Sequence, residues 1–247
     1  MRKSRVPADT DFRLRGKQHV TRLESFSDCV FAFALTLLVV SLEVPKSFTD
    51  LLSAMRGMVA FAFCFAVLFG LWSRHHTFFR RFGLEDGATK ALTACLLFVV
   101  LAYVYPLKFL SLVVVNVGLG LDRSASGRMF TRGQELEQVR GLFVLYGGGL
   151  FAISIVFFFM YRYALSRRSE LELNEIEAYD TRWFATENLF QAAVPVIATA
   201  LAFILPPQMV GMAGFSYCLY GLAGFMFGSI YGKGRRMKVA ELGTEKG

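Results

Sequence analysis

Six long apolar segments, separated by shorter polar ones, follow one another along this chain of 247 residues. A helix needs about 20 mostly apolar residues to cross the hydrocarbon core of a membrane. The segments have about that length, and 55% of the chain is hydrophobic, with 26 Phe residues. They cover residues 26–44, 54–74, 88–115, 141–163, 184–205 and 209–231. We therefore expect an all-α, polytopic membrane protein with six transmembrane helices per subunit.

The positive charges predict the orientation of these helices. With the N-terminus inside, 20 of the 27 Lys and Arg residues fall in the two terminal tails and the second and fourth loops. Because Lys and Arg accumulate on the cytoplasmic side, both termini are predicted to be cytoplasmic and the location to be the cell membrane. The net charge of +8 then reflects topology rather than nucleic acid binding. The expected parts are a basic tail (1–25), a six-helix transmembrane domain (26–231) and a second basic tail (232–247).

The residue types that catalysis or metal binding needs do not come together in the sequence. It has no Gly-x-Ser-x-Gly, no phosphate-binding loop and no His-Glu-x-x-His. His75 and His76 are adjacent, so on a helix their side chains point about 100° apart and do not share one ion. The four Cys residues lie far apart inside apolar segments, which favours free thiols. We expect neither an enzyme nor a metal or organic cofactor.

The first apolar segment has two faces when its residues are placed at about 100° per residue. Within roughly 40° of Phe33 lie Phe26, Cys29, Leu37, Val40 and Val44, with Thr36 at the edge of this stripe. Apolar residues occur on every face of a membrane helix, so the stripe alone identifies no pore. Ser27 and Asp28 lie on the opposite side. Because a carboxylate in a membrane costs a few kcal/mol, Asp28 is expected to meet donors from a neighbouring helix.

Two motifs at the ends of the first two helices resemble one family. They are Arg22-x-x-x-Phe26-Ser27-Asp28 and Leu71-Trp72-Ser-Arg-His75-His76-x-x-Phe79. Together with the helix count, they resemble the transmembrane protein 175 family, the endosomal and lysosomal potassium channels of animals and their bacterial relatives. No second Phe-Ser-Asp occurs, so the chain looks like the bacterial, single-repeat type. One first helix cannot enclose a pore, so the resemblance implies a symmetric homotetramer with four first helices around the axis.

The resemblance also implies roles for individual residues. It places Phe33, Leu37 and Val40 at a pore constriction, with Thr36 at the shoulder of the same face; family members usually carry Ile or Leu where this chain has Phe33. The implied cytoplasmic-side network comprises Arg22, Phe26, Ser27, Asp28, Trp72, His75 and His76. We predict that Asp28 accepts a hydrogen bond from Trp72 or from one of the two His side chains, fixing the first helix against the second. A structural anchor and a gating role are both compatible with this.

The function implied is that of a potassium-selective channel with a hydrophobic constriction, because the Thr-Val-Gly-Tyr-Gly filter is absent. K⁺ is then the permeant ion, and the partners are the lipid bilayer and the other subunits. A proton or weakly selective cation channel on the same scaffold is an alternative. A secondary transporter is another, although the inverted repeats typical of transporters are missing. Glu43, near the expected outer mouth, predicts a fourfold acidic ring that concentrates cations.

Four local patterns carry structural expectations. Gly224-x-x-x-Gly228-x-x-x-Gly232 predicts close helix packing within the subunit, and Gly147–Gly149 predicts either the same or a loosened helix. The acidic stretch 169–180 is interpreted as a solvated amphipathic helix or a linker, with a regulatory site as the alternative. Pro106 predicts a kink in the third helix.

Overall fold

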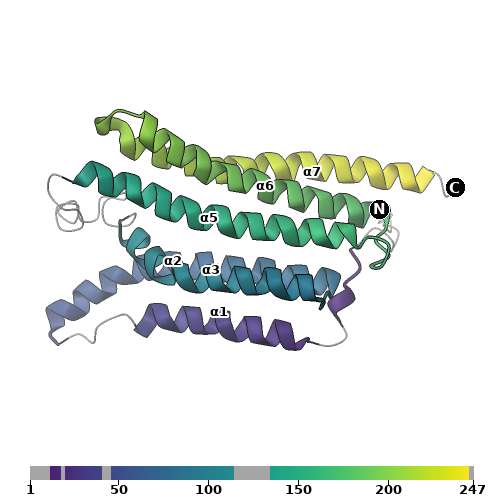
Figure 1. Cartoon of the computed structure of the whole chain (residues 1–247), viewed down its shortest axis with the longest axis horizontal. Helices are drawn as coiled ribbons and strands as arrows, with labels where there is room; N and C mark the ends of the chain where they lie inside the picture. The colour runs from purple at the N-terminus through teal and green to yellow at the C-terminus, as the bar shows by residue number, and fades with distance from the viewer. Residues whose placement is uncertain (1–11, 18–19, 41–45, 114–133, 245–247) are drawn as a thin grey trace, which may run out of the picture.

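The computed structural model describes residues 12–17, 20–40, 46–113 and 134–244, and this part of the chain is almost entirely helical (Figure 1). Its α-helices are α1 (Arg22–Val40), α2 (Phe48–Phe82), α3 (Gly87–Val113), α5 (Glu135–Ser166), α6 (Glu175–Ile204) and α7 (Cys218–Thr244). Two 3-10 helices, η2 (Arg15–Lys17) and η4 (Pro207–Tyr217), precede α1 and α7. No strand occurs in the ranges described, so the all-α prediction is confirmed.

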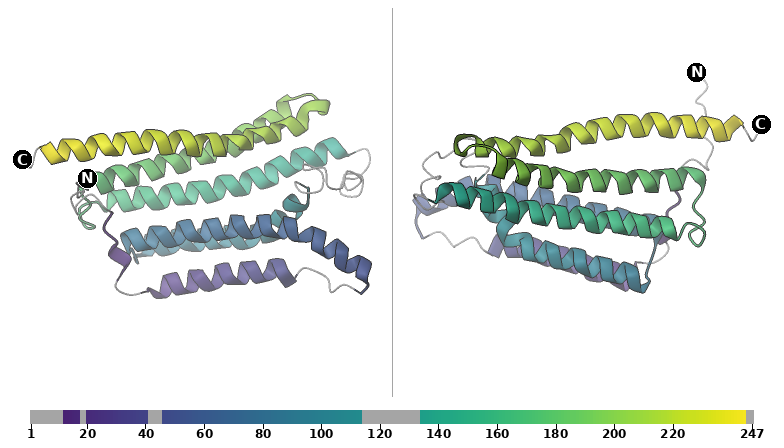
Figure 2. Two further views of the ribbon diagram at one scale, coloured as in Figure 1. Left: turned by 180° about the vertical axis from the view of Figure 1, so that it is seen from behind. Right: turned by 45° about the horizontal axis from the view of Figure 1, so that its top comes forward.

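The long helices lie side by side with nearly parallel axes (Figures 1 and 2). α3 contacts α1, α2 and α5, while α6 contacts α5 and α7, so the order across the bundle largely follows the chain. Five helical stretches among the described residues are long and apolar enough to cross a membrane: 58–82, 87–111, 135–166, 175–204 and 207–241. A multi-pass membrane protein is thereby confirmed. α1 is not among the five, so the sixth span stays a prediction.

Aromatic rings hold the C-terminal end of α2 against α5. Phe78 and Phe82 are fully buried, and each packs edge-on against the ring of Tyr161, with centroids 5.5 and 6.0 Å apart. Lipid tails are as apolar as these side chains, so close van der Waals packing rather than the hydrophobic effect stabilises such contacts inside a membrane. α2 therefore continues to Phe82 as an integral part of the bundle, eight residues beyond the predicted span.

The α2–α3 turn is fixed by one glycine and one aspartate. Gly83 adopts φ +59°, a left-handed conformation that favours glycine, and its N–H donates to the Phe79 carbonyl at 2.8 Å. Asp86 then accepts from the Thr89 amide at 2.9 Å and from the Tyr163 hydroxyl. Desolvation on its own raises the pKa of Asp86, but these hydrogen bonds outweigh it and hold that pKa below its usual range.

The glycines divide into closely packed and open positions. A Cβ on Gly149 would clash with the ring of Tyr103, and one on Gly147 would lie 2.7 Å from the Thr199 hydroxyl. These two glycines therefore allow α5 to approach α3 and α6 closely. The prediction that Gly224, Gly228 and Gly232 pack closely within the subunit was wrong, because a Cβ at any of these positions would meet nothing within 4 Å. That face of α7 points away from the rest of the subunit, since α7 packs on α6 through its aromatic side.

The basic N-terminal segment is tied to the start of α6. Arg15 donates to both carboxylate oxygens of Glu177, at 3.2 and 2.7 Å, and the Arg13 amide donates to Oε1 at 2.8 Å. Glu177 also completes a capping box with Asn174, whose side chain accepts from the Glu177 amide at 2.8 Å. We call the contact of Arg13 and Arg15 with Glu177 the N-terminal clasp. The solvated reading of this acidic stretch was wrong at Glu177, whose side chain is only 1% exposed.

Candidate functional site

The first turn of α1 is stabilised by hydrogen bonds between residues close together in the sequence. Thr21 and Glu24 form a reciprocal capping pair, in which the Glu24 amide donates to the Thr21 hydroxyl at 3.1 Å and the Thr21 amide donates to the Glu24 carboxylate at 3.0 Å. The pair satisfies two backbone donors that a helix start leaves open. Ser27 is fully buried one turn later and donates to the Leu23 carbonyl at 2.7 Å. These bonds place the motif residues on the first two turns of α1.

α1 presents one packed face and one open face to its subunit. Phe31, Ala34 and Leu38 are at most 2% exposed and belong to the main core. Phe33 and Phe26, on the other face, are 57% and 61% exposed. The open face includes part of the stripe identified from the sequence, because Phe26, Cys29, Phe33 and Thr36 are exposed and Leu37 is half-buried. It extends beyond the stripe to Asp28, Ala32 and Val39, which are exposed too. Large aromatic side chains are thus left uncovered on the helix that carries the first motif.

Asp28 joins α1 to α2. The indole Nε1 of Trp72 donates to Asp28 Oδ1 at 2.7 Å, which is one of the two arrangements expected from the sequence. A bond from an N–H to a carboxylate is about twice as strong as one between neutral groups. It therefore restrains the axial position and the rotation of α1 relative to α2 at this point.

The two histidines of the second motif lie in different surroundings. His75 is 1% exposed, with its ring centroid 5.9 Å from that of Phe31 and 4.7 Å from that of Phe79. His76 instead stacks on Trp72 at 5.3 Å with an interplanar angle of 17°. The motif therefore contributes one histidine to the core and one to the surface that bears the Trp72–Asp28 bond. Within the described residues no group of His, Cys, Asp and Glu is arranged to hold a metal ion.

Some of the site residues predicted from the sequence do not take part in the contacts between α1 and α2. Arg22 is exposed at the first residue of α1, and the structure places no motif partner against it. Val40 ends α1, but its side chain lies outside what the structure describes, and so does the whole of Glu43. Thr36 lies on the open face, where its hydroxyl donates to the Phe33 carbonyl at 2.7 Å. Its oxygen lone pairs therefore remain as acceptors on that face.

The sequence reading missed a polar network behind the motif. Arg74, two residues after Trp72, donates to Gln191 Oε1 at 3.0 Å and to Asn188 Oδ1, both on α6. Its guanidinium carbon also lies 4.7 Å from the centroid of the Phe157 ring on α5. An arginine inside an apolar segment, with Asn and Gln three residues apart on one face of a later helix, was a usable signal. The network connects the α1–α2 contact to α5 and α6.

These features define a multi-pass membrane protein whose motif-bearing helix turns an apolar face outward from the subunit. Residues 22–106, which span α1, α2 and most of α3, match the family model "Endosomal/lysosomal potassium channel TMEM175". A protein of Marivirga tractuosa described as a potassium channel is 39% identical over 235 residues, 94% of this chain and 95% of that protein. A potassium channel of Chamaesiphon minutus is 26% identical over 199 residues, 77% of this chain and 88% of its own length.

Solved structures agree with these relatives. A variant of the potassium channel MtTMEM175, crystallised with a nanobody–MBP fusion, superimposes with a TM-score of 0.76 at 38% identity, over 90% of this chain and 97% of that one. A lysosomal potassium-selective channel TMEM175 homolog from Chamaesiphon minutus gives 0.54 at 26% identity, over 83% and 96%. The chain belongs to the TMEM175 family, a family of ion channels rather than enzymes.

Proposed function

We propose that this chain is one subunit of a potassium channel in which the open face of α1 lines the pore. The observation that carries the proposal is the division of α1 into a packed face, with Phe31 in the core and Asp28 bonded to Trp72 at its edge, and an uncovered face that carries Phe33. A helix that is packed against its own subunit on one face and exposed on the other is suited to pack against the same helix of neighbouring subunits. The curated relatives described as potassium channels support the same function.

One subunit supplies a single α1, so the proposal needs a symmetric homotetramer with four α1 helices around the axis. α1 then forms the sixth membrane span, and both termini lie in the cytoplasm of the cell membrane. The N-terminal clasp supports this orientation, because it puts Arg13 and Arg15 beside the Lys- and Arg-rich ends of α2, α5 and α7.

The constriction consists of apolar rings instead of backbone carbonyls. Four copies of Phe33, followed by Leu37 and Val40, form a narrow apolar passage that expels water, and an ion does not cross such a passage dry. Opening has to widen the rings enough for a partly hydrated cation. K⁺ gives up water more easily than Na⁺, which favours K⁺. Thr36, whose hydroxyl proton is held by the helix backbone, offers oxygens that replace part of the lost hydration shell.

The motif network sets how α1 moves. Because Trp72 holds Asp28 near one end of α1, widening at Phe33 is a tilt or rotation about that end rather than a displacement of the whole helix. Glu43, in the segment outside the described residues, follows the constriction at the outer mouth and attracts cations there. Its replacement by Gln is expected to lower conductance chiefly at low salt, where charges are least screened.

Recording from the purified protein in planar bilayers tests the function directly. Under K⁺/Na⁺ bi-ionic conditions, we expect unitary currents with a reversal potential displaced toward that of K⁺. A reversal potential that follows the pH gradient instead would indicate a proton channel, and one near zero a weakly selective cation channel. Saturable, coupled flux without unitary currents would indicate a transporter and refute the proposal.

A further inference from the structure

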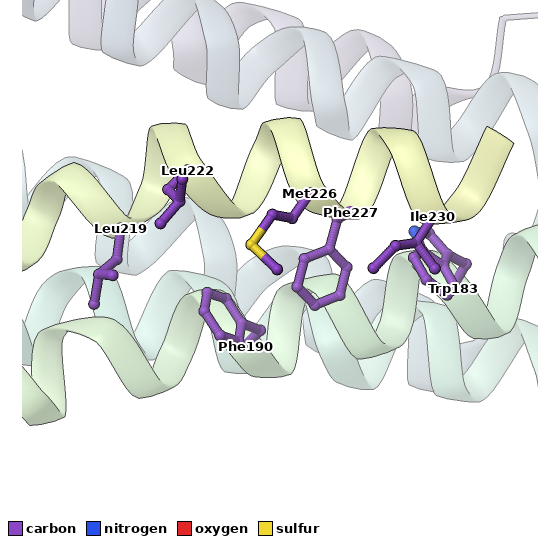
Figure 3. Close-up of a pocket in the computed structure, with 7 residues that line it drawn as sticks. All are labelled: Trp183, Phe190, Leu219, Leu222, Met226, Phe227 and Ile230. Carbon is purple, nitrogen blue, oxygen red and sulfur yellow. The ribbon is translucent and has the colours of Figure 1, made fainter. Parts of the chain in front are cut away.

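An apolar groove separate from the pore-lining helix runs between α6 and α7 (Figure 3). Five α7 side chains between Leu219 and Ile230 form one wall, and Trp183 and Phe190 of α6 form the other. The cavity has a volume of about 230 Å³, and every side chain that lines it is apolar or aromatic. Figure 3 shows these side chains projecting into one elongated space along both helices.

The length of the groove corresponds to one leaflet of a bilayer. Leu219 and Ile230 are eleven residues apart, which at 1.5 Å per residue is about 16 Å along α7. The hydrocarbon core is about 30 Å thick, so a single leaflet contributes about 15 Å. A groove of this length takes one extended acyl chain of one leaflet.

Positive charge lies at one end of the groove only. Lys233 follows Ile230 by three residues and so continues the same face of α7 by one turn, and it is exposed. Arg182 directly precedes Trp183 on α6 and is also exposed. Within one turn of Leu219, α7 has no charged residue, and the charged residue nearest to Phe190 on α6 is the acidic Glu187, three positions before it. An indole at the boundary between an apolar groove and cationic side chains is typical of the membrane–water interface.

Two other cations near this end of the groove form ion pairs with α6. Arg235 pairs with Asp180 at 3.3 Å, and Lys238 lies 3.6 Å from Glu175. Both contacts join the C-terminal part of α7 to the start of α6. They therefore hold the charged end of the groove in a fixed shape while Lys233 and Arg182 face outward.

We propose that this groove binds one anionic phospholipid of the cytoplasmic leaflet, with an acyl chain between α6 and α7 and the phosphate against Lys233 and Arg182. The inference rests on the proposed topology, which puts the charged end on the cytoplasmic side. The anionic charge of that leaflet complements the two cations, and each Lys or Arg near such a surface strengthens the attraction. A bound lipid of this kind bridges the last two helices of the subunit without touching the pore.

Native mass spectrometry of the purified full-length protein tests the proposal without any measurement of current. The protein is released from micelles containing equal amounts of phosphatidylglycerol and phosphatidylcholine, and retained lipid is counted per subunit. We expect the wild type to retain phosphatidylglycerol preferentially. Lys233→Gln is expected to lower that retention about fivefold. The matched control Lys90→Gln, which removes an exposed cation near the start of α3, should leave it unchanged.

A second variant tests the contribution of the apolar groove separately from that of the positive charge. Met226→Trp fills the cavity while it leaves Lys233 in place, so it should also abolish the preference for phosphatidylglycerol. Equal retention of the two lipids by the wild type would overturn the proposal. So would equal effects of Lys233→Gln and Lys90→Gln, or undiminished retention by Met226→Trp. Failure to record potassium currents, in contrast, would refute the proposed function and leave the lipid result standing.

Discussion

The N-terminal clasp allows a quantitative test of how the ends of the subunit are held together. Glu177→Gln keeps the size of the side chain but leaves one oxygen in place of two, and it turns an NH₂ group toward the guanidinium of Arg15. Breaking one partner of a buried ion pair costs about 3–5 kcal/mol. Because the Arg13 side chain is half exposed, water can solvate it once the ion pair is broken. We therefore expect the lower value, a loss of about 3 kcal/mol in the free energy of unfolding. For a chain of this size that corresponds to a melting temperature lower by about 6–12 °C.

The assay is thermal unfolding of the detergent-solubilised protein, followed by size-exclusion chromatography of heated aliquots. The control is Glu170→Gln, which removes an equally short ion pair, 2.7 Å to Arg167, from an exposed site. Because exposed ion pairs contribute little, its melting temperature should stay close to that of the wild type. Equal shifts in the two variants would refute the argument that the clasp stabilises the subunit through a buried carboxylate.

Three further substitutions test contacts inside the bundle. Trp72→Phe keeps the aromatic stack but removes the N–H that donates to the Asp28 carboxylate, so it should lower the free energy of unfolding by about 1.5 kcal/mol. The control Trp183→Phe should cost less, because the Trp183 indole donates no hydrogen bond within the described residues. Gly149→Ala puts a methyl group into the facing tyrosine ring and should cost about 1–3 kcal/mol, whereas Gly148→Ala should be tolerated. Arg74→Lys keeps the charge but loses the forked contact with α6, and thermal melts should show a loss of at least about 1 kcal/mol.

The helices and one tertiary contact were predictable from the sequence for a clear reason. Long apolar segments have few alternatives to a membrane helix, and a carboxylate such as Asp28 inside one requires a donor. The end of α2 was harder to place, since Arg80 and Arg81 resemble a loop after an apolar segment. The helix continues past residue 74 because neither glycine nor proline occurs between Gly70 and Gly83, the residue that takes the left-handed conformation.

The contacts that escaped prediction join residues far apart in the chain. Arg13 and Glu177 are 164 positions apart, and no periodicity links a basic tail to one acid among several in a later segment. The local part of that site had a signal, since Asn174 followed three residues later by Glu177 is a capping pattern. The glycines spaced four residues apart on α7 led to a wrong prediction of close packing, because small residues permit such packing but do not require it.

The division of α1 into an anchored and an open face is tested most directly by single-channel recording of two matched variants. Phe33→Ala removes the ring proposed to close the pore, while Val39→Ala shortens another exposed apolar residue about 120° around α1 from Phe33, outside the proposed pore-lining stripe. We predict that Phe33→Ala raises open probability and weakens the preference for K⁺ over Na⁺, and that Val39→Ala changes neither. Unaltered currents in Phe33→Ala, or equal changes in both variants, would contradict a pore lined by this face.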